Sequence, residues 1–271
     1  MDEERLVAIS PERSVRLAPE LLDLIQRPQH ADYVVRTITR REANGMPLMS
    51  AEIVIAGRET RSRHPLSATY PLHFRKTYFA GRLHGDTSKE FESQTTASRV
   101  LGIPPPIGFD PDCFRACLVP GRPYQRLSPF GLDPEDSNLR AAAKVSVPEA
   151  AGLWGFLASA LRQLYALHDS GLAHGDAELH NFIVSPAPLE VVPVDFEGTV
   201  AREGLEPAAW DARRAMDLAP LLREAVCVQC VLGRQRGPLA DATWAALDRL
   251  FKAPDRFRRA IEVALESTEP A

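Results

Sequence analysis

The segment AHGDAELHNFIV, residues 173–184, decides the fold, because it crowds polar side chains into a loop that runs into an apolar strand. Five of the eight positions from His174 to Asn181 carry ionisable or amide side chains. Asp195 follows a second apolar run and can return to the same place. Carboxylate and amide oxygens suit magnesium held against phosphates, and a further carboxylate can accept a proton from an attacking hydroxyl. The segment predicts a phosphate-and-metal site; the alternative is a surface loop with a capping Asp and an exposed Asn.

The composition bounds the class of protein. The 271 residues suffice for one large domain or two small lobes with a buried core. A hydrophobic content of 45% and a charged content of 25% are ordinary for a soluble globular protein, and the net charge of -4 disfavours a surface built mainly for nucleic acid. The acidic start MDEERLVAIS is unlike a secretory signal, and no apolar run reaches about 18 residues. We therefore expect no membrane span and a cytoplasmic location.

The first half of the chain has the pattern of β structure with one helix. Strands are predicted where β-branched and aromatic residues lie between turn residues, in DYVVRTITR, SAEIVIAG, LHFRKTYF and CFRACLV. The segment DTSKEFESQTTASRVLG predicts a helix, with Asp86 or Thr87 as N-cap and Gly102 at its end. GIPPPIGF predicts a rigid connector, and residues 1–31 predict an N-terminal extension with a short helix in APELLDLIQ.

The second half has the pattern of helices with one hairpin. Apolar residues follow the i, i+3, i+4, i+7 series from Leu153 to His168, which predicts a helix ended by Gly171. Two short apolar segments, NFIVS and LEVVPVDF, predict a β-hairpin. A later helix should begin close to Asp217 as N-cap, because Pro220 is tolerated only in a first helical turn. The helices expected after the hairpin lie near residues 216–232, 240–252 and 255–266.

The order of these polar residues resembles that of the protein-kinase-like superfamily. HGDAELHN is similar to its catalytic loop, H-x-D-x-x-x-x-N, and VDFEG is similar to its metal-binding D-F-G element. The resemblance covers about residues 32–235 and implies an α+β, two-lobed kinase-like fold that uses ATP and Mg²⁺. It implies a small β-rich N-lobe over residues 32–122 and a mainly helical C-lobe over residues 123–271. By the same analogy Asp176 is the catalytic base, and Asn181 and Asp195 are magnesium ligands. His174 is a structural residue.

The resemblance also implies a lysine for the nucleotide phosphates and a glutamate that orients it. Strand alternation places Lys76 on one face with Leu72, Phe74 and Tyr78, as the family's lysine is placed, and turns Arg75 toward solvent. Glu92 is the predicted partner, with Glu90 behind it. The alternatives are an ordinary surface lysine and a solvated helix face.

Two further positions follow from the resemblance. Asp217 matches the aspartate that opens a helix and steadies the catalytic loop; the alternative is a capping Asp without that connection. The segment LVPGRPYQRL resembles the strand and linker between the lobes, where backbone groups around Leu118 and Pro120 could meet adenine.

Three departures indicate the branch of the superfamily. No glycine-rich loop precedes Lys76, since the candidate turn REANGMP holds only Gly45. Glu178 stands where serine/threonine protein kinases have a lysine. The segment between Phe196 and Asp217 is too short for an activation segment and lacks A-P-E. The chain is therefore more similar to aminoglycoside kinases, lipopolysaccharide-sugar kinases and the RIO-like group, in which Glu197 can replace the glycine of D-F-G and add a metal ligand.

The expected function is transfer of the γ-phosphoryl group of ATP to a hydroxyl acceptor, a small molecule or a sugar. The alternatives are an atypical serine/threonine protein kinase and a nucleotide-binding pseudokinase scaffold. Glu178 and Asp211 could meet a cationic acceptor or simply belong to a solvated surface. Cys227 and Cys230 form C-x-x-C, which indicates zinc or redox chemistry or, more simply, small buried thiols in an apolar helix.

Overall fold

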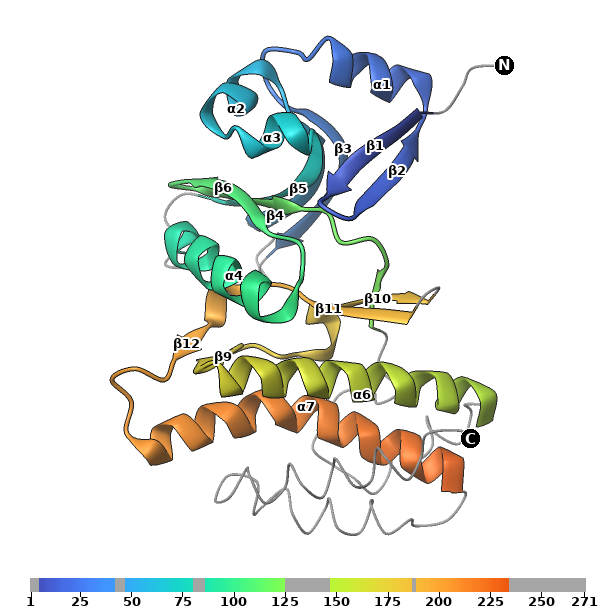
Figure 1. Cartoon of the computed structure of the whole chain (residues 1–271), viewed down its shortest axis with the longest axis vertical. Coiled ribbons are helices and arrows are strands. Elements are labelled where there is room, and N and C mark those ends of the chain that lie inside the picture. Colours follow the sequence, from blue (N-terminus) through green and yellow to red (C-terminus); the bar gives the residue numbers. More distant parts are fainter. Residues whose placement is uncertain (1–4, 42–46, 80–85, 125–146, 187–188, 234–271) are drawn as a thin grey trace. The chain divides into compact units, whose positions relative to one another are not determined.

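The computed structural model describes residues 5–41, 47–79, 86–124, 147–186 and 189–233 (Figure 1). Contacts divide the chain into two compact units, unit 1 over residues 1–119 and unit 2 over residues 120–271. This boundary falls three residues before the expected division between residues 122 and 123. Unit 1 is rich in β-sheet and unit 2 in helix, so the described chain is a mixed α and β structure. No described helix combines the length and the hydropathy that a membrane crossing requires.

Unit 1 is built on a five-stranded antiparallel sheet in the order β3-β4-β5-β7-β6. Its strands are β3 (Tyr33–Arg41), β4 (Pro47–Ile55), β5 (Leu72–Tyr78), β6 (Pro106–Asp110) and β7 (Cys113–Cys117). The four strands expected from β-branched patterns are confirmed. The expected connector GIPPPIGF is wrong in part, because β6 begins within it at Pro106. Proline is tolerated there because β6 lies at the edge of the sheet and begins with that residue.

Helix α4 (Thr87–Leu101) confirms the predicted helix and both of its ends. The Asp86 carboxylate accepts a hydrogen bond of 3.0 Å from the Lys89 amide, so Asp86 is the N-cap. Gly102 ends the helix with a φ of 66°, a left-handed conformation that glycine adopts without strain. The helix contacts β6 and β7, and its buried residues are spaced at helical intervals: Thr87, Glu90, Gln94 and Ala97.

The expected N-terminal extension is a packed part of unit 1. It forms the hairpin of β1 (Arg5–Ser10) and β2 (Arg13–Leu17) and then the expected short helix, α1 (Pro19–Gln26). Its buried residues share one apolar cluster with Ile55 and Leu72 of the sheet: Ile9, Leu17 and Leu22. The sequence pattern missed the hairpin because its exposed positions include Leu6 as well as Arg5 and Arg16, so polar and apolar residues do not alternate along it. The shared cluster reveals its place.

Two short helices, α2 (Arg58–Arg63) and α3 (Leu66–Thr69), lie between β4 and β5. The Gly57 amide at the start of α2 donates to the Asp32 carboxylate at 3.0 Å. The His64 carbonyl oxygen accepts the hydroxyl of the buried Ser67 at 2.6 Å, which joins the two helices. Side-chain and backbone hydrogen bonds therefore hold this insertion in place.

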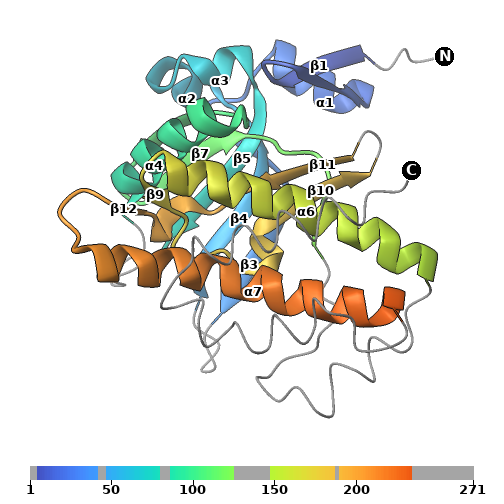
Figure 2. The same ribbon diagram turned by 60° about the horizontal axis from the view of Figure 1, so that its bottom comes forward.

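Unit 2 contains two long helices, α6 (Val147–Asp169) and α7 (Pro207–Gly233), which pack side by side (Figures 1 and 2). The expected hairpin is confirmed as β10 (Phe182–Pro186) and β11 (Leu189–Pro193), with β8 (Arg122–Pro123) added to its edge. Gly171 follows α6 with a φ of 82°, as its expected role requires. A small ladder joins β9 (Leu172–Ala173) to β12 (Val200–Ala201), and two single turns are η1 (Leu179–Asn181) and η2 (Phe196–Gly198).

The expected start of a helix at Asp217 is wrong. Helix α7 begins ten residues earlier, at Pro207, and contains Pro220 in its interior. A proline there removes one hydrogen bond and costs about 3 kcal/mol. Side chains on both sides of it are buried, including Trp210, Leu218 and Leu221, and their burial offsets that cost. The helices expected at 240–252 and 255–266 lie outside the described residues.

Candidate functional site

Asp217 anchors the polar loop that precedes β10. Its Oδ2 accepts hydrogen bonds from the His174 amide at 2.7 Å and from His168 Nε2 at 2.9 Å, and its Oδ1 accepts from the Gly175 amide at 2.8 Å. The carboxylate is 1% exposed, so these donors replace its hydration. The structure thus places Asp217 against the predicted catalytic loop, from the middle of α7 and not from a helix start.

Gly175 allows the loop to pass close to η2. Its φ is 82°, and a Cβ there would lie 1.9 Å from the Gly198 carbonyl oxygen. Only glycine fits this position, both because of the left-handed backbone and because of the close approach. The middle residue of His-Gly-Asp therefore brings Asp176 next to the turn that follows Asp195.

His174 is a fully buried structural residue. Its Nε2 donates to the Val194 carbonyl oxygen at 3.1 Å, and its ring centroid lies 4.8 Å from that of Phe196. Burial lowers the pKa of His174, so the imidazole is neutral and its single proton serves the bond to Val194. This side chain ties the loop to the residue directly before Asp195.

Asn181 fixes the orientation of Asp176. Its Nδ2 donates to the Asp176 carbonyl oxygen at 2.9 Å and to Asp176 Oδ2 at 3.0 Å. The Asn181 carbonyl oxygen accepts from the Val194 amide at 2.9 Å, which brings the end of β11 beside η1. Since the amide nitrogen donates to Asp176, Oδ1 is the atom of this side chain that is chemically able to act as a metal ligand.

Asp195 has a φ of 69° and is the one non-glycine residue with positive φ among the described residues. Such a backbone costs on the order of 1 kcal/mol or more and is frequent at functional sites. Phe196, the next residue, is 1% exposed and holds the turn in the core of unit 2. Asp195 is half-buried and Asp176 is exposed, so both carboxylates can meet a ligand.

Asn181 and Asp195 fit magnesium in the type of ligand that they offer. Mg²⁺ is usually held by one or two carboxylates together with water and substrate phosphates, and not by an all-protein cage. The described residues contain no group of three or more His, Cys, Asp and Glu side chains placed to hold a metal. A magnesium ion here would therefore need the Asn181 amide oxygen and ligands from a bound nucleotide. Glu178 and Glu197 are both half-buried, and Asp211 pairs with Arg214 at 2.5 Å.

In unit 1 the carboxylate that meets Lys76 is Glu90 and not the expected Glu92. Lys76 is 2% exposed, and its Nζ lies 3.4 Å from Glu90 Oε1. Glu92 is exposed, because two residues along a helix turn the side chain by roughly 200° to the other face. The spacing of Glu90 with Gln94 and Ala97 is the sequence signal that could have identified the inward glutamate.

Leu118 and Pro120, the expected adenine-binding positions, fall on either side of the boundary between the units. Leu118 packs against the apolar cluster of unit 1. In unit 2 the Pro120 carbonyl oxygen accepts the Ser185 hydroxyl at 2.5 Å, and Gly121 follows with a φ of 136°. This carbonyl already has a protein donor, so its second lone pair is what remains for a ligand.

Arg75 is not solvent-facing as expected. Its Nη1 donates to Asp32 Oδ2 at 2.8 Å, and its Nε donates to Glu52 Oε2 at 2.7 Å. Arg115 Nη1 donates to the same Asp32 oxygen at 2.7 Å. Sequence reasoning missed this cluster because its members are far apart in the chain and each alone has the pattern of a surface charge.

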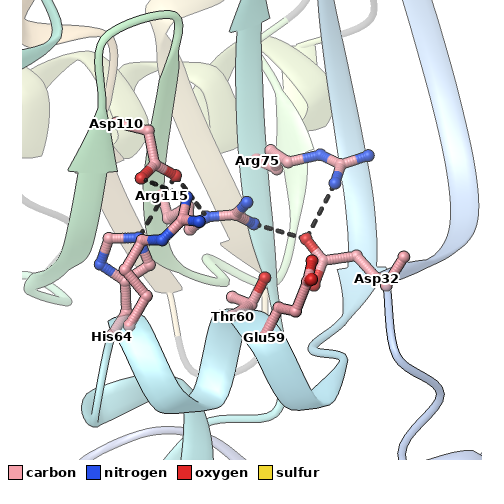
Figure 3. A pocket seen from close by; sticks show the side chains of 9 residues that line it. Asp32, Glu59, Thr60, His64, Arg75, Asp110 and Arg115 are labelled. Carbon is pink, nitrogen blue, oxygen red and sulfur yellow. Dashed lines mark hydrogen bonds and ion pairs between the residues drawn. The ribbon is translucent and has the colours of Figure 1, made fainter.

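Asp32, Arg75 and Arg115 line a pocket of about 200 Å³ between the sheet and α2 (Figure 3). Asp110 pairs there with Arg63 at 2.9 Å and with His64 at 3.3 Å. Burial tends to raise the pKa of Asp32, but hydrogen bonds from Thr60 and Gly57 and the charge of Arg115 outweigh it and lower the pKa to about 2. Acidic and basic side chains alternate around the pocket and pair with one another. The cluster therefore has a structural role, because it connects separate segments of unit 1.

Cys113 and Cys117 are free, buried thiols on β7. Burial raises the pKa of Cys117 to about 12, and burial also raises the pKa of Cys113, so both are inert as nucleophiles. The C-x-x-C pair lies within the helix expected for it, α7, and its side chains lie outside the described residues.

Unit 2 thus holds one candidate group of functional residues, the Asp217-anchored loop, and unit 1 holds another, the buried Lys76–Glu90 pair. Their chemistry is inferred from these side chains and their partners. No protein-family model matches the chain, and the search of curated proteins gives no significant match.

Proposed function

We propose that the protein is an ATP-dependent phosphotransferase that moves the γ-phosphoryl group to a hydroxyl acceptor, a small molecule or a sugar. The observation that carries the proposal is the capture of two successive loop amides, those of His174 and Gly175, by the buried Asp217 carboxylate. This anchor and the Asn181 amide hold Asp176 in one orientation at the surface of unit 2. A preorganised, exposed carboxylate is what a general base requires.

The residues of unit 2 have distinct proposed roles. Asp176 accepts the proton of the attacking hydroxyl, a task typically worth 10²–10⁴-fold in rate. Asn181 and Asp195 would hold magnesium, which when bound offsets charge on the phosphates. The hydrogen bond from the Val194 amide to the Asn181 carbonyl oxygen keeps Asn181 close to Asp195. His174 positions the end of β11 without taking part in proton transfer, because it is buried and neutral.

Unit 1 supplies the proposed phosphate-binding cation. Lys76 lies on the central strand β5, and Glu90 in the first turn of α4 holds its ammonium group. A lysine fixed by a carboxylate can bind phosphate oxygens without a loss of side-chain entropy at that moment. We take unit 1 as the N-lobe and unit 2 as the C-lobe of a kinase-like fold, with Leu118 and Pro120 near the adenine.

The acceptor is proposed to be small because the chain after η2 is short. Only residues 199–206 separate that turn from α7, and they include the two-residue strand β12. Protein kinases place the platform for a protein substrate in the corresponding segment, and eight residues cannot build one. The acceptor therefore presents its hydroxyl directly to Asp176.

The test is magnesium-dependent formation of ADP by the full chain, with and without a panel of sugars and amino sugars. Wild type is compared with Asp176→Asn, and Glu203→Gln is a control at an exposed carboxylate of unit 2. We expect loss of about 10²–10⁴-fold for Asp176→Asn and no change for the control. Equal ADP formation by wild type and Asp176→Asn would contradict the proposal. Binding of ATP without turnover would favour a pseudokinase. Transfer of labelled phosphate to the chain itself would favour an atypical protein kinase.

A further inference from the structure

Each oxygen of the Glu90 carboxylate contacts a side chain of strand β5. Oε1 lies 3.4 Å from Lys76 Nζ, and Oε2 accepts the Tyr78 hydroxyl at 2.9 Å. Lys76 Nζ also lies 5.1 Å from the centroid of the Tyr78 ring. All three side chains are buried, with residue exposures of 2% for Lys76, 1% for Glu90 and 9% for Tyr78. Tyr78 therefore contacts both members of the ion pair.

The two distances show which partner holds the carboxylate more tightly. A well-aligned bond between an ammonium and a carboxylate has a length of about 2.7–2.9 Å, so 3.4 Å is long for such a pair. The bond from Tyr78 at 2.9 Å is shorter, and it joins a neutral donor to a charged acceptor. The Tyr78 hydroxyl is therefore the closer of these two contacts of the Glu90 carboxylate.

The strand explains why these residues meet. Side chains two apart on a strand project from the same face, so Lys76 and Tyr78 both point toward the first turn of α4, where Glu90 lies. The face of a tyrosine ring also attracts a cation within about 6 Å of its centroid. One residue thus supplies a donor for the carboxylate and a negative ring face for the ammonium.

We infer that Tyr78 is a positioning residue for Lys76: its hydroxyl holds Glu90, and its ring faces the ammonium that is to receive the nucleotide phosphates. The inference rests on the proposed function, since it concerns the affinity of that site for phosphate. It predicts that the Tyr78 hydroxyl affects the binding of ATP only through Lys76. Adenosine, which has no phosphates, is then indifferent to it.

The test compares the dissociation constants of magnesium-ATP and of adenosine for Tyr78→Phe and wild type. The matched control is Tyr124→Phe, which removes another buried tyrosine hydroxyl from a glutamate, Glu224, at 3.3 Å in unit 2. We expect Tyr78→Phe to weaken ATP binding by about 10- to 150-fold, as loss of a bond to a charged group implies. Adenosine binding should stay within about twofold, and the control should change neither ligand.

A second comparison separates positioning from general stability. In a Lys76→Ala background, Tyr78→Phe should cause no further loss of ATP affinity, because the group on which it acts is gone. An undiminished loss in that background, or an equal loss for ATP and adenosine, would overturn the inference. If the wild type binds and consumes ATP, an unchanged dissociation constant of magnesium-ATP for Tyr78→Phe would also overturn the inference. A wild type that neither binds nor consumes ATP would overturn the proposed function itself, and the inference with it.

Discussion

The Asp217 carboxylate, in the middle of α7, accepts a hydrogen bond of 2.8 Å from the backbone amide of Gly175, 42 residues earlier in the chain. The same carboxylate also takes the His174 amide and the His168 imidazole. A side chain that is 1% exposed therefore sets the backbone of the loop that carries Asp176. The long helix acts as the fixed body against which the loop is placed.

Replacement of Asp217 by Ala should destabilise unit 2 and lower turnover. The buried His174 amide and the partly buried Gly175 amide would lose their acceptor, and an unsatisfied buried group costs about 1–3 kcal/mol. We expect the free energy of unfolding in urea to fall by about 2–5 kcal/mol. Asp211→Asn is the control, since Asp211 lies on the same helix but pairs with Arg214 while it is 35% exposed, and exposed pairs contribute about 0–1 kcal/mol. Equal effects of the two substitutions would contradict the role of Asp217.

Gly175→Ala and Gly171→Ala form a matched pair. Both glycines have a φ of 82°, so alanine strains the backbone at each by about 1–2 kcal/mol. At Gly171 the nearest atom to a Cβ is 3.8 Å away, whereas at Gly175 it would overlap the Gly198 carbonyl. We expect Gly175→Ala to lower both the melting temperature and ADP formation much more than Gly171→Ala does. Comparable losses would mean that the close approach to η2 does not matter.

Glu90→Gln and Glu92→Gln test which glutamate supports Lys76. Removal of one charge from a buried pair leaves the other uncompensated and typically costs about 3–5 kcal/mol. Glu90→Gln should therefore lower the unfolding free energy of unit 1 and the affinity for ATP. Glu92 is exposed, and its substitution should change neither by more than about 0.5 kcal/mol. A larger effect at position 92 would restore the assignment that the sequence alone suggested.

The stability of unit 1 should fall in mild acid because of His73. This residue is fully buried, and burial together with the charge of Arg115 lowers its pKa to about 4 from an ordinary value of 6.5. Between those pH values the unfolded chain binds more protons than the folded chain, so stability is complete above about pH 6.5 and is lost as pH falls toward 4. The slope approaches about 1.4 kcal/mol per pH unit.

His73→Gln is the variant that checks this pH dependence. Nδ1 of His73 donates to the Tyr70 carbonyl oxygen and Nε2 accepts from Arg115, and a glutamine amide can do both. The difference in unfolding free energy between pH 7 and pH 5 should shrink in the variant. His174, whose pKa burial also lowers, keeps a part of the dependence in unit 2. An unchanged difference for unit 1 would show that His73 is not responsible.

Local patterns predicted the parts of the molecule that local chemistry determines. The N-cap at Asp86, the glycine at position 102 and the strand holding Lys76 all depend on neighbours along the chain. The hairpin after Asn181 was predicted for the same reason.

The misses arose where distant parts of the chain decide the outcome. Pro220 has the pattern of a helix start until the burial of residues on both sides is known. Arg75 has the pattern of a surface charge until Asp32, 43 residues away, is found beside it. Glu90 and Glu92 differ only in the face of α4 on which they lie, and the packing of that helix makes the choice.

The Asp32 carboxylate joins four separate segments of unit 1: its own, the Gly57 amide at the start of α2, and the arginines of β5 and β7. The Asp32 side chain is 3% exposed, so water molecules cannot replace its hydrogen bonds individually. The insertion of α2 and α3 should consequently not fray by itself. The backbone amide proton of Gly57 should exchange with deuterium only when the whole sheet opens. Its exchange should therefore be as slow as that of the amide protons at the centre of β5.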